Sequence, residues 1–138
     1  MAADFTVIRA VRARFGDTTE VLAGEHQAPH VGVAEDFAFN CPMVDSSQMA
    51  VLEFESVDVT VAGNVMTLNG KSLSAPIRKS PGSGASAVWT ANVVLVDKGI
   101  LKPSGNILHV EARNANGGAS GNRDDFILDN IVIFYKTA

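Results

Sequence analysis

The chain has very little cysteine, since Cys41 is the only one in 138 residues. An internal disulfide is therefore excluded, and so is a metal site built from several thiolates. Burial of apolar side chains must hold the fold together instead. A chain of this length buries roughly two thirds of the surface that it exposes when unfolded. We therefore expect residues 1–138 to form one domain around one core.

Positive charge is also scarce. The sequence has 11 lysines and arginines against 15 aspartates and glutamates, a formal net charge of −4. A surface that follows nucleic-acid phosphates needs clustered lysine and arginine. The one basic cluster, Arg9, Arg12 and Arg14, lies in an alternating segment that is typical of a strand with one solvent face. We expect no nucleic-acid partner.

Long hydrophobic runs are missing as well. No stretch approaches the roughly 20 apolar residues of a membrane-spanning helix. The first 16 residues contain no uncharged apolar run of signal-peptide length. We expect neither a membrane span nor an N-terminal signal peptide, and the composition assigns no cell compartment.

Helical periodicity is hard to find, and strand patterns take its place. Twelve glycines and five prolines punctuate segments rich in valine, isoleucine, threonine and phenylalanine. This pattern predicts an all-β fold, a two-sheet antiparallel sandwich of about eight strands. Within residues 50–61 the apolar parity changes after Phe54, which predicts a β-bulge near Glu55 and Ser56.

The most apolar segment lies close to the C-terminus, in residues 126–135. Phe126, Leu128, Val132 and Phe134 share one parity, and Ile127, Ile131, Ile133 and Tyr135 share the other. A strand that is apolar on both faces must be covered on both, or must lead into a subunit contact. We predict a central strand, as in a jelly-roll sandwich. Asp129 interrupts it and needs a partner, for which we expect Arg113.

Four segments, "NVMTLNGKSL" (64–73), "AVWT" (87–90), "LKPSGNILHVEARN" (101–114) and "DDFILDNIVIF" (124–134), follow one another in a familiar order. This order resembles the galactose-binding-like jelly-roll superfamily, which includes many carbohydrate-binding modules. The resemblance covers roughly residues 48–136. It implies a jelly-roll topology and a sugar-binding function, although a fold alone does not fix a site.

The same resemblance implies a structural calcium ion. In many members an aspartate just before the last strand and a glutamate from an early strand hold it, and Asp125 matches the first position. Glu20 and Glu25 are the candidates for the second. Carboxylate oxygens are the ligands that calcium prefers. The alternative is a solvated turn, in which Asp124 and Asp125 cap backbone N–H groups or pair with Arg123.

The ligand site is predicted in two loops rich in small and polar residues, 79–86 and 114–121, and at their borders. Trp89 is either a core side chain or an exposed platform for a sugar ring. Amide and guanidinium groups supply the donors that sugar hydroxyls need. The predicted ligand-binding residues are Arg78, Lys79, Trp89, Asn114, Asn116, Arg123 and Asp124.

No catalytic set is recognisable. The sequence has no glycine-rich phosphate loop and no Ser-His-Asp pattern. We therefore predict a non-catalytic carbohydrate-binding domain or small lectin that binds glycans through loops at one end. The alternative is a structural or assembly subunit that uses the sandwich for protein–protein contacts and forms homo-oligomers.

Overall fold

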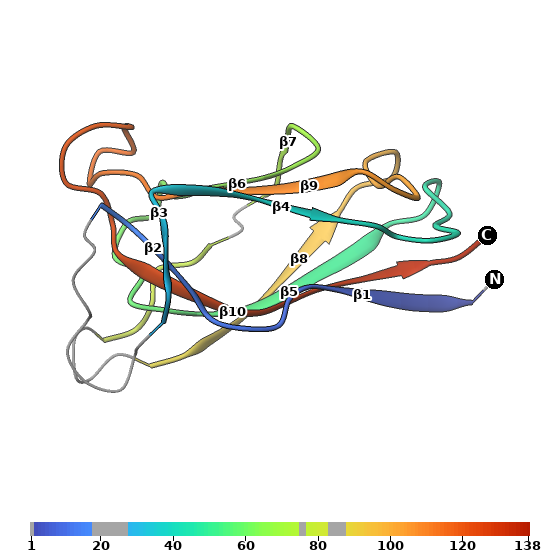
Figure 1. The fold of residues 1–138 in the computed structure, drawn as a ribbon, viewed down its shortest axis with the longest axis horizontal. Helices are drawn as coiled ribbons and strands as arrows, with labels where there is room; N and C mark the ends of the chain where they lie inside the picture. The colour runs from blue at the N-terminus through green and yellow to red at the C-terminus, as the bar shows by residue number, and fades with distance from the viewer. Residues whose placement is uncertain (1, 18–27, 75–76, 83–87) are drawn as a thin grey trace.

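A computed structural model describes residues 2–17, 28–74, 77–82 and 88–138. Within these residues it contains ten strands and no helix, in two facing sheets (Figure 1). Sheet A has the order β3 (His30–Gly32), β2 (Ala13–Phe15), β10 (Phe126–Lys136), β5 (Ala50–Val57) and β8 (Thr90–Val96), and β1 (Ala3–Arg9) also pairs with β10. Sheet B has the order β4 (Ala34–Phe39), β9 (Asn106–Glu111), β6 (Val65–Leu68) and β7 (Lys71–Ser72). The predicted all-β sandwich is confirmed.

The connections follow the predicted jelly-roll topology. The chain passes from one sheet to the other between β3 and β4, β4 and β5, β5 and β6, β7 and β8, β8 and β9, and β9 and β10. All sheet pairings are antiparallel except the short parallel pair β2 and β3. The described strands number ten rather than about eight, because residues 4–15 divide into β1 and β2 and because β3 and β7 are short additional strands.

The predicted central position of the last strand is confirmed. Along one edge β10 pairs with β5, and along the other it pairs first with β2 and then with β1. The bulge prediction is wrong in its placement. β5 pairs with β8 in unbroken register, and the irregularity lies across from Phe54, where two residues of β10 stand between Asp129 and Val132. Asn130 has φ 50°, a left-handed conformation that asparagine tolerates better than most residues.

This bulge corrects the predicted faces of the last strand. Because it inserts one residue, the inward parity changes from even to odd numbers within β10. Phe126 and Leu128 face the core before the bulge, and Ile131, Ile133 and Tyr135 face it afterwards. Fewer apolar side chains of β10 therefore lie on the outer face than the sequence suggests. On the outer face Ile127 is fully buried, whereas Phe134 is exposed.

The core lies between the two sheets. Its aromatic centre is formed by Phe15, whose ring stacks on Phe126 at 5.2 Å and meets Phe37 edge-on at 6.2 Å. Cys41 is fully buried in the same cluster. Burial raises the pKa of its thiol to about 11, so the cysteine is a core residue and not a reactive thiolate at neutral pH.

The two ends of the sandwich differ. At one end lie the connection from β5 to β6, the connection from β9 to β10 and residues 77–82 (Figure 1). We call this the loop end. The two chain termini and the connections from β4 to β5 and from β8 to β9 lie at the other end. None of the described residues belongs to a helix that is long and apolar enough to cross a membrane.

Candidate functional site

Asp124 organises the loop end. Its side chain is buried although it is a carboxylate, and it accepts four hydrogen bonds from the connection between β5 and β6. The donors are the Thr60 backbone N–H at 3.0 Å, the Thr60 hydroxyl at 2.8 Å, the Val61 N–H at 3.1 Å and the Asn64 amide at 2.8 Å. Asp124 is therefore a structural residue that ties one loop to the start of β10, and not an exposed ligand donor.

A second loop is folded around Asn114. Its side-chain oxygen accepts the N–H groups of Asn116 at 2.9 Å and Gly118 at 2.8 Å, and its side-chain nitrogen donates to the Ser120 carbonyl at 2.8 Å. All the polar atoms of this side chain are therefore used inside the loop. Asn114 shapes the predicted site, and beyond its bond to Ser120 its side-chain nitrogen keeps one N–H.

The two loops approach each other closely at two glycines. A Cβ atom on Gly63 would lie 3.0 Å from the Cα of Gly117. Next to this contact lies a depression of about 440 Å³, which we call the loop hollow, and it is lined by Thr60, Val61, Ala62, Gly63, Lys79, Ala115, Asn116 and Gly117. Its volume falls in the usual range of small-molecule sites.

Two predicted ligand residues, Lys79 and Asn116, line the loop hollow together. Both side chains are exposed, and neither makes a hydrogen bond or ion pair to another side chain in the described part of the chain. Lys79 is positioned by its neighbour Ser80, whose backbone N–H donates to Val59 at 2.8 Å and whose hydroxyl accepts from the Val59 N–H at 3.0 Å. Arg78 is exposed beside it.

Arg123 is half-buried and acts within the fold. Its guanidinium donates to the carbonyl of Ala112 at 3.2 Å and to the carbonyl of Ala119, and its backbone N–H donates to the Asp17 carboxylate at 3.0 Å. These bonds hold the loop of residues 114–121 against β9 and the chain that follows β2. Arg123 therefore stabilises the loop of residues 114–121, which lines part of the loop hollow.

Trp89 does not line the loop hollow and lies directly before β8. It is half-buried and lies outside the core cluster, so the core alternative is wrong. The Arg12 guanidinium lies over its ring at 4.7 Å, and the same group lies 3.6 Å from the Asp129 carboxylate. The predicted pair of Asp129 with Arg113 is also wrong, since Arg113 pairs with Glu111. Asp129 sits at the bulge, beside β2 and not beside β9.

Asp125 is the one predicted calcium ligand that falls within the described residues, because Glu20 and Glu25 lie outside them. Its side chain packs against Gly16, where an added Cβ would overlap the carboxylate. The described residues contain no group of three histidine, cysteine or acidic side chains arranged to hold a metal ion. Because Asp124 is fully used, Asp125 would be the only ligand from this pair.

Sequence reasoning placed Lys79 and Asn116 in the loops that line the loop hollow, but it did not name half of the lining residues. Thr60 and Gly63 were not among the predicted residues, although the sequence Ala-Gly-Asn at 62–64 is typical of a tight turn. The sequence does not show that this turn contacts Gly117.

Comparisons with protein-family models, with curated proteins and with solved structures found no match to this chain.

Proposed function

We propose that this domain binds carbohydrate in the loop hollow. The observation that carries the proposal is the meeting of Lys79 and Asn116 in a depression of about 440 Å³ between two loops. The resemblance to galactose-binding-like domains supports a sugar as the ligand.

The chemistry of the lining suits sugar hydroxyls. The Asn116 amide offers both donors and an acceptor, and the Lys79 ammonium offers three donors. The bonds of Asp124 and Asn114 fix the two loops before any ligand arrives. Such pre-organisation favours binding because fewer groups have to be ordered when the ligand arrives.

The charge of the lining favours acidic sugars over neutral ones. Lys79 lines the loop hollow, the exposed Arg78 lies beside it, and the Asp124 carboxylate beneath is occupied by four donors. A uronate or sulfated sugar would gain a charge-assisted hydrogen bond there. We also propose a structural calcium ion at Asp125, with Glu20 and Glu25 as the other candidate ligands.

The test is isothermal titration of the domain with neutral and acidic mono- and oligosaccharides chosen from a glycan array. We expect binding at about millimolar or tighter affinity, which Asn116→Ala and Lys79→Met should each weaken at least roughly tenfold. Lys98→Met is the matched control, since Lys98 is an exposed lysine on the connection from β8 to β9, at the other end of the sandwich. No binding to any of the sugars would overturn the proposal.

Assembly is the second candidate function. The outer face of sheet A favours it, because five large apolar side chains are exposed there on β1, β10 and β8. This function involves a surface different from the loop hollow, so one chain could perform both.

A further inference from the structure

The outer face of sheet A carries two complete cross-strand rows of side chains. The strand registers align Phe5, Phe134, Val51 and Leu95 in one row and Val7, Val132, Glu53 and Val93 in the next. Seven of these eight side chains are apolar. We call the surface formed by these eight residues the apolar face.

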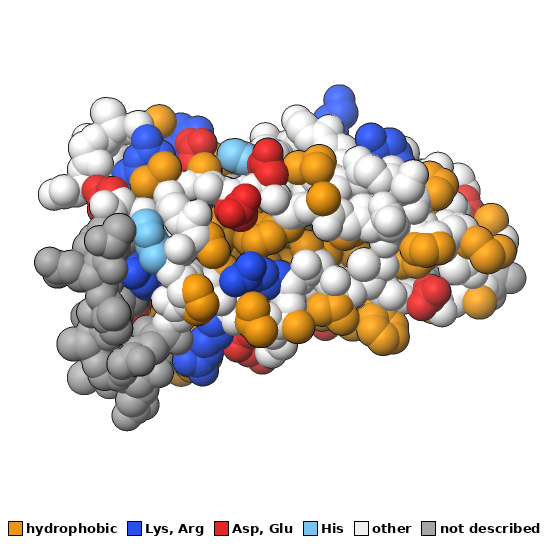
Figure 2. All heavy atoms as spheres, in the orientation of Figure 1, with side chains coloured by type: hydrophobic (Ala, Val, Ile, Leu, Met, Phe, Trp, Pro, Cys, Tyr) orange, Lys and Arg blue, Asp and Glu red, His pale blue; other side chains and the backbone are white. Residues whose placement is uncertain are grey.

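The apolar face is largely open to solvent. Its five exposed apolar side chains range from 41% exposed at Phe134 to 61% at Leu95. Phe5 and Phe134 lie with their ring centroids 6.1 Å apart, so the row is continuous across β1 and β10. Figure 2 shows hydrophobic side chains along the margin of the molecule that β1 forms. Monomeric proteins seldom expose contiguous apolar patches larger than a few hundred Å².

The size of this surface suits a small protein interface. With the charged residues that flank them, the two rows cover four strands about 4.8 Å apart and six residues at about 3.3 Å each, a face roughly 20 Å on each side. Its projected area of roughly 400 Å² is about half of the roughly 800 Å² of accessible surface per partner that a standard interface buries.

Opposite charges flank the two rows. Lys136 follows Phe134 by two residues on β10, and Glu55 follows Glu53 by two residues on β5, so both side chains belong to the outer face. Both are exposed, and neither forms an ion pair with another described residue. Lys136 therefore lies at one end of the apolar face, and Glu53 and Glu55 make the other end negative.

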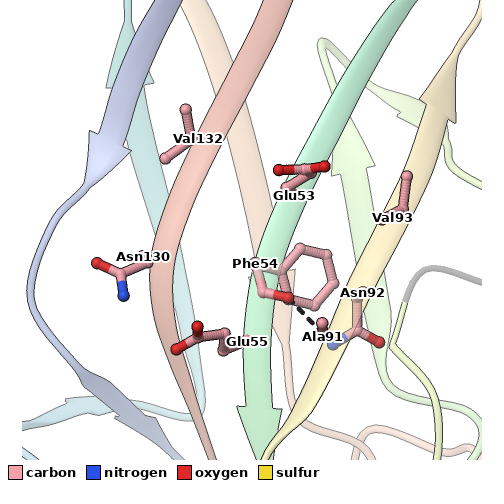
Figure 3. A pocket seen from close by; sticks show the side chains of 8 residues that line it. All are labelled: Glu53, Phe54, Glu55, Ala91, Asn92, Val93, Asn130 and Val132. Atoms are coloured by element: carbon pink, nitrogen blue, oxygen red, sulfur yellow. Dashed lines mark hydrogen bonds between the residues drawn. The ribbon is translucent and has the colours of Figure 1, made fainter.

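The negative end is hollowed at the bulge. A depression of about 250 Å³ lies there, with Glu53, Glu55, Asn130 and Val132 in its lining. Figure 3 shows these side chains on one side of the sheet, with Glu55 pointing towards Asn130 across β10 and β5. A lysine side chain suits such a site, because its methylene stem packs on valine while its ammonium reaches the carboxylates.

We propose that a second copy of this chain covers the apolar face and that the two sheets A pack face to face. The two-fold axis lies in the plane between the two sheets, perpendicular to the strands, and it exchanges the two ends of the face. It places Lys136 of each copy beside the Glu55 end of the other and lays the apolar rows against each other. This arrangement is isologous and closed, as in most homodimers. It deepens the assembly function and does not depend on sugar binding.

The first test is sedimentation velocity over a dilution series. We expect a dimer that dissociates on dilution, and Leu95→Lys should raise its dissociation constant at least roughly tenfold. Ile107→Lys is the matched control, because Ile107 is an exposed isoleucine on β9, outside sheet A, and it should leave the constant unchanged. Circular dichroism verifies that both variants are folded.

Charge reversal gives the second test. Lys136→Glu and Glu55→Lys should each weaken the dimer, and the double variant should restore it, since each reversed charge meets a reversed partner. A monomer at the highest soluble concentration would overturn the proposal, and so would a dimer that ignores Leu95→Lys or is not restored by the double variant. A monomer that floats with phosphatidylcholine vesicles would assign the face to lipid and overturn it equally. Lys79→Met should leave the dimer intact, so the proposal of a sugar site is tested independently of the proposal of a dimer.

Discussion

The loop end is built from polar side chains and the apolar face from hydrophobic ones. The two regions differ in whether contacts within the chain satisfy these side chains. At the loop end the buried carboxylate of Asp124 is satisfied by the chain itself through four hydrogen bonds. On the apolar face, side chains such as Leu95 and Val93 remain exposed. Substitution of Asp124 should therefore cost folding stability, whereas a substitution on the apolar face should cost association.

The largest expected effect is at Asp124. Removal of its carboxylate leaves the N–H groups of Thr60 and Val61 and the Asn64 amide without their acceptor inside the fold. We expect Asp124→Ala to lower the free energy of unfolding by about 3 kcal/mol, measured by urea denaturation. Asp97→Ala is the control, since that carboxylate is exposed, and it should change the value by less than about 0.5 kcal/mol. An equal effect of the two variants would contradict the structural role of Asp124.

Calcium should have the next largest effect. If Asp125 holds an ion in the folded state only, a hundredfold excess over the dissociation constant stabilises the fold by about 2.7 kcal/mol. We expect a higher melting temperature in calcium than in chelator for the parent chain, and no difference for Asp125→Ala. A flat melting temperature in the parent chain would remove the calcium site from the loop end.

The bulge in β10 gives a smaller effect. Asn130 has φ 50°, which a β-branched residue adopts only under strain. Asn130→Val should therefore lower the free energy of unfolding by about 1–2 kcal/mol, while Asn130→Gly should stay close to the parent. Urea denaturation measures both. Equal free energies of unfolding for the valine and glycine variants would contradict the need for a left-handed backbone at residue 130.

The smallest expected effect on stability is on the apolar face. Leu95 is exposed in an edge strand, where lysine is well accommodated. Leu95→Lys should change the free energy of unfolding by less than about 0.5 kcal/mol when it is measured on dilute, dissociated protein. A loss of several kcal/mol there would mean that Leu95 belongs to the fold of the single chain.

The sequence was sufficient for the architecture because the architecture follows from local patterns. Short strands separated by glycine and proline, and an apolar final strand, predict a sandwich with β10 in its centre. The bulge was misplaced because the parity change in residues 50–61 coincides with the end of β5, where Asp58 has φ 62°. The real bulge is marked by Asp129 and Asn130, which the sequence alone presented as an interruption in need of a partner.

The candidate site could be predicted only in part. Sequence reasoning placed Lys79 and Asn116 at one end because flexible, polar loops carry binding residues. It could not tell that Asn114, Arg123 and Asp124 bond within the fold, since most of their partners are backbone groups and those of Asp124 lie up to 64 residues away. The partner of Asp129 is set by strand order, and Arg12 reaches it because β2 lies beside β10.

The two outer faces of the sandwich allow the most direct test. The outer face of sheet B carries a charged network, in which His109 contacts Asp36 at 2.6 Å and Glu111 at 3.5 Å. Methyl NMR spectra recorded across a dilution series should show shifts for Val7, Val93, Leu95 and Val132 on the apolar face. The methyl groups of Ile107 and Val65 on sheet B should not shift. Spectra that do not change with concentration, or shifts centred on sheet B, would contradict the assignment of the apolar face as the contact surface of this protein.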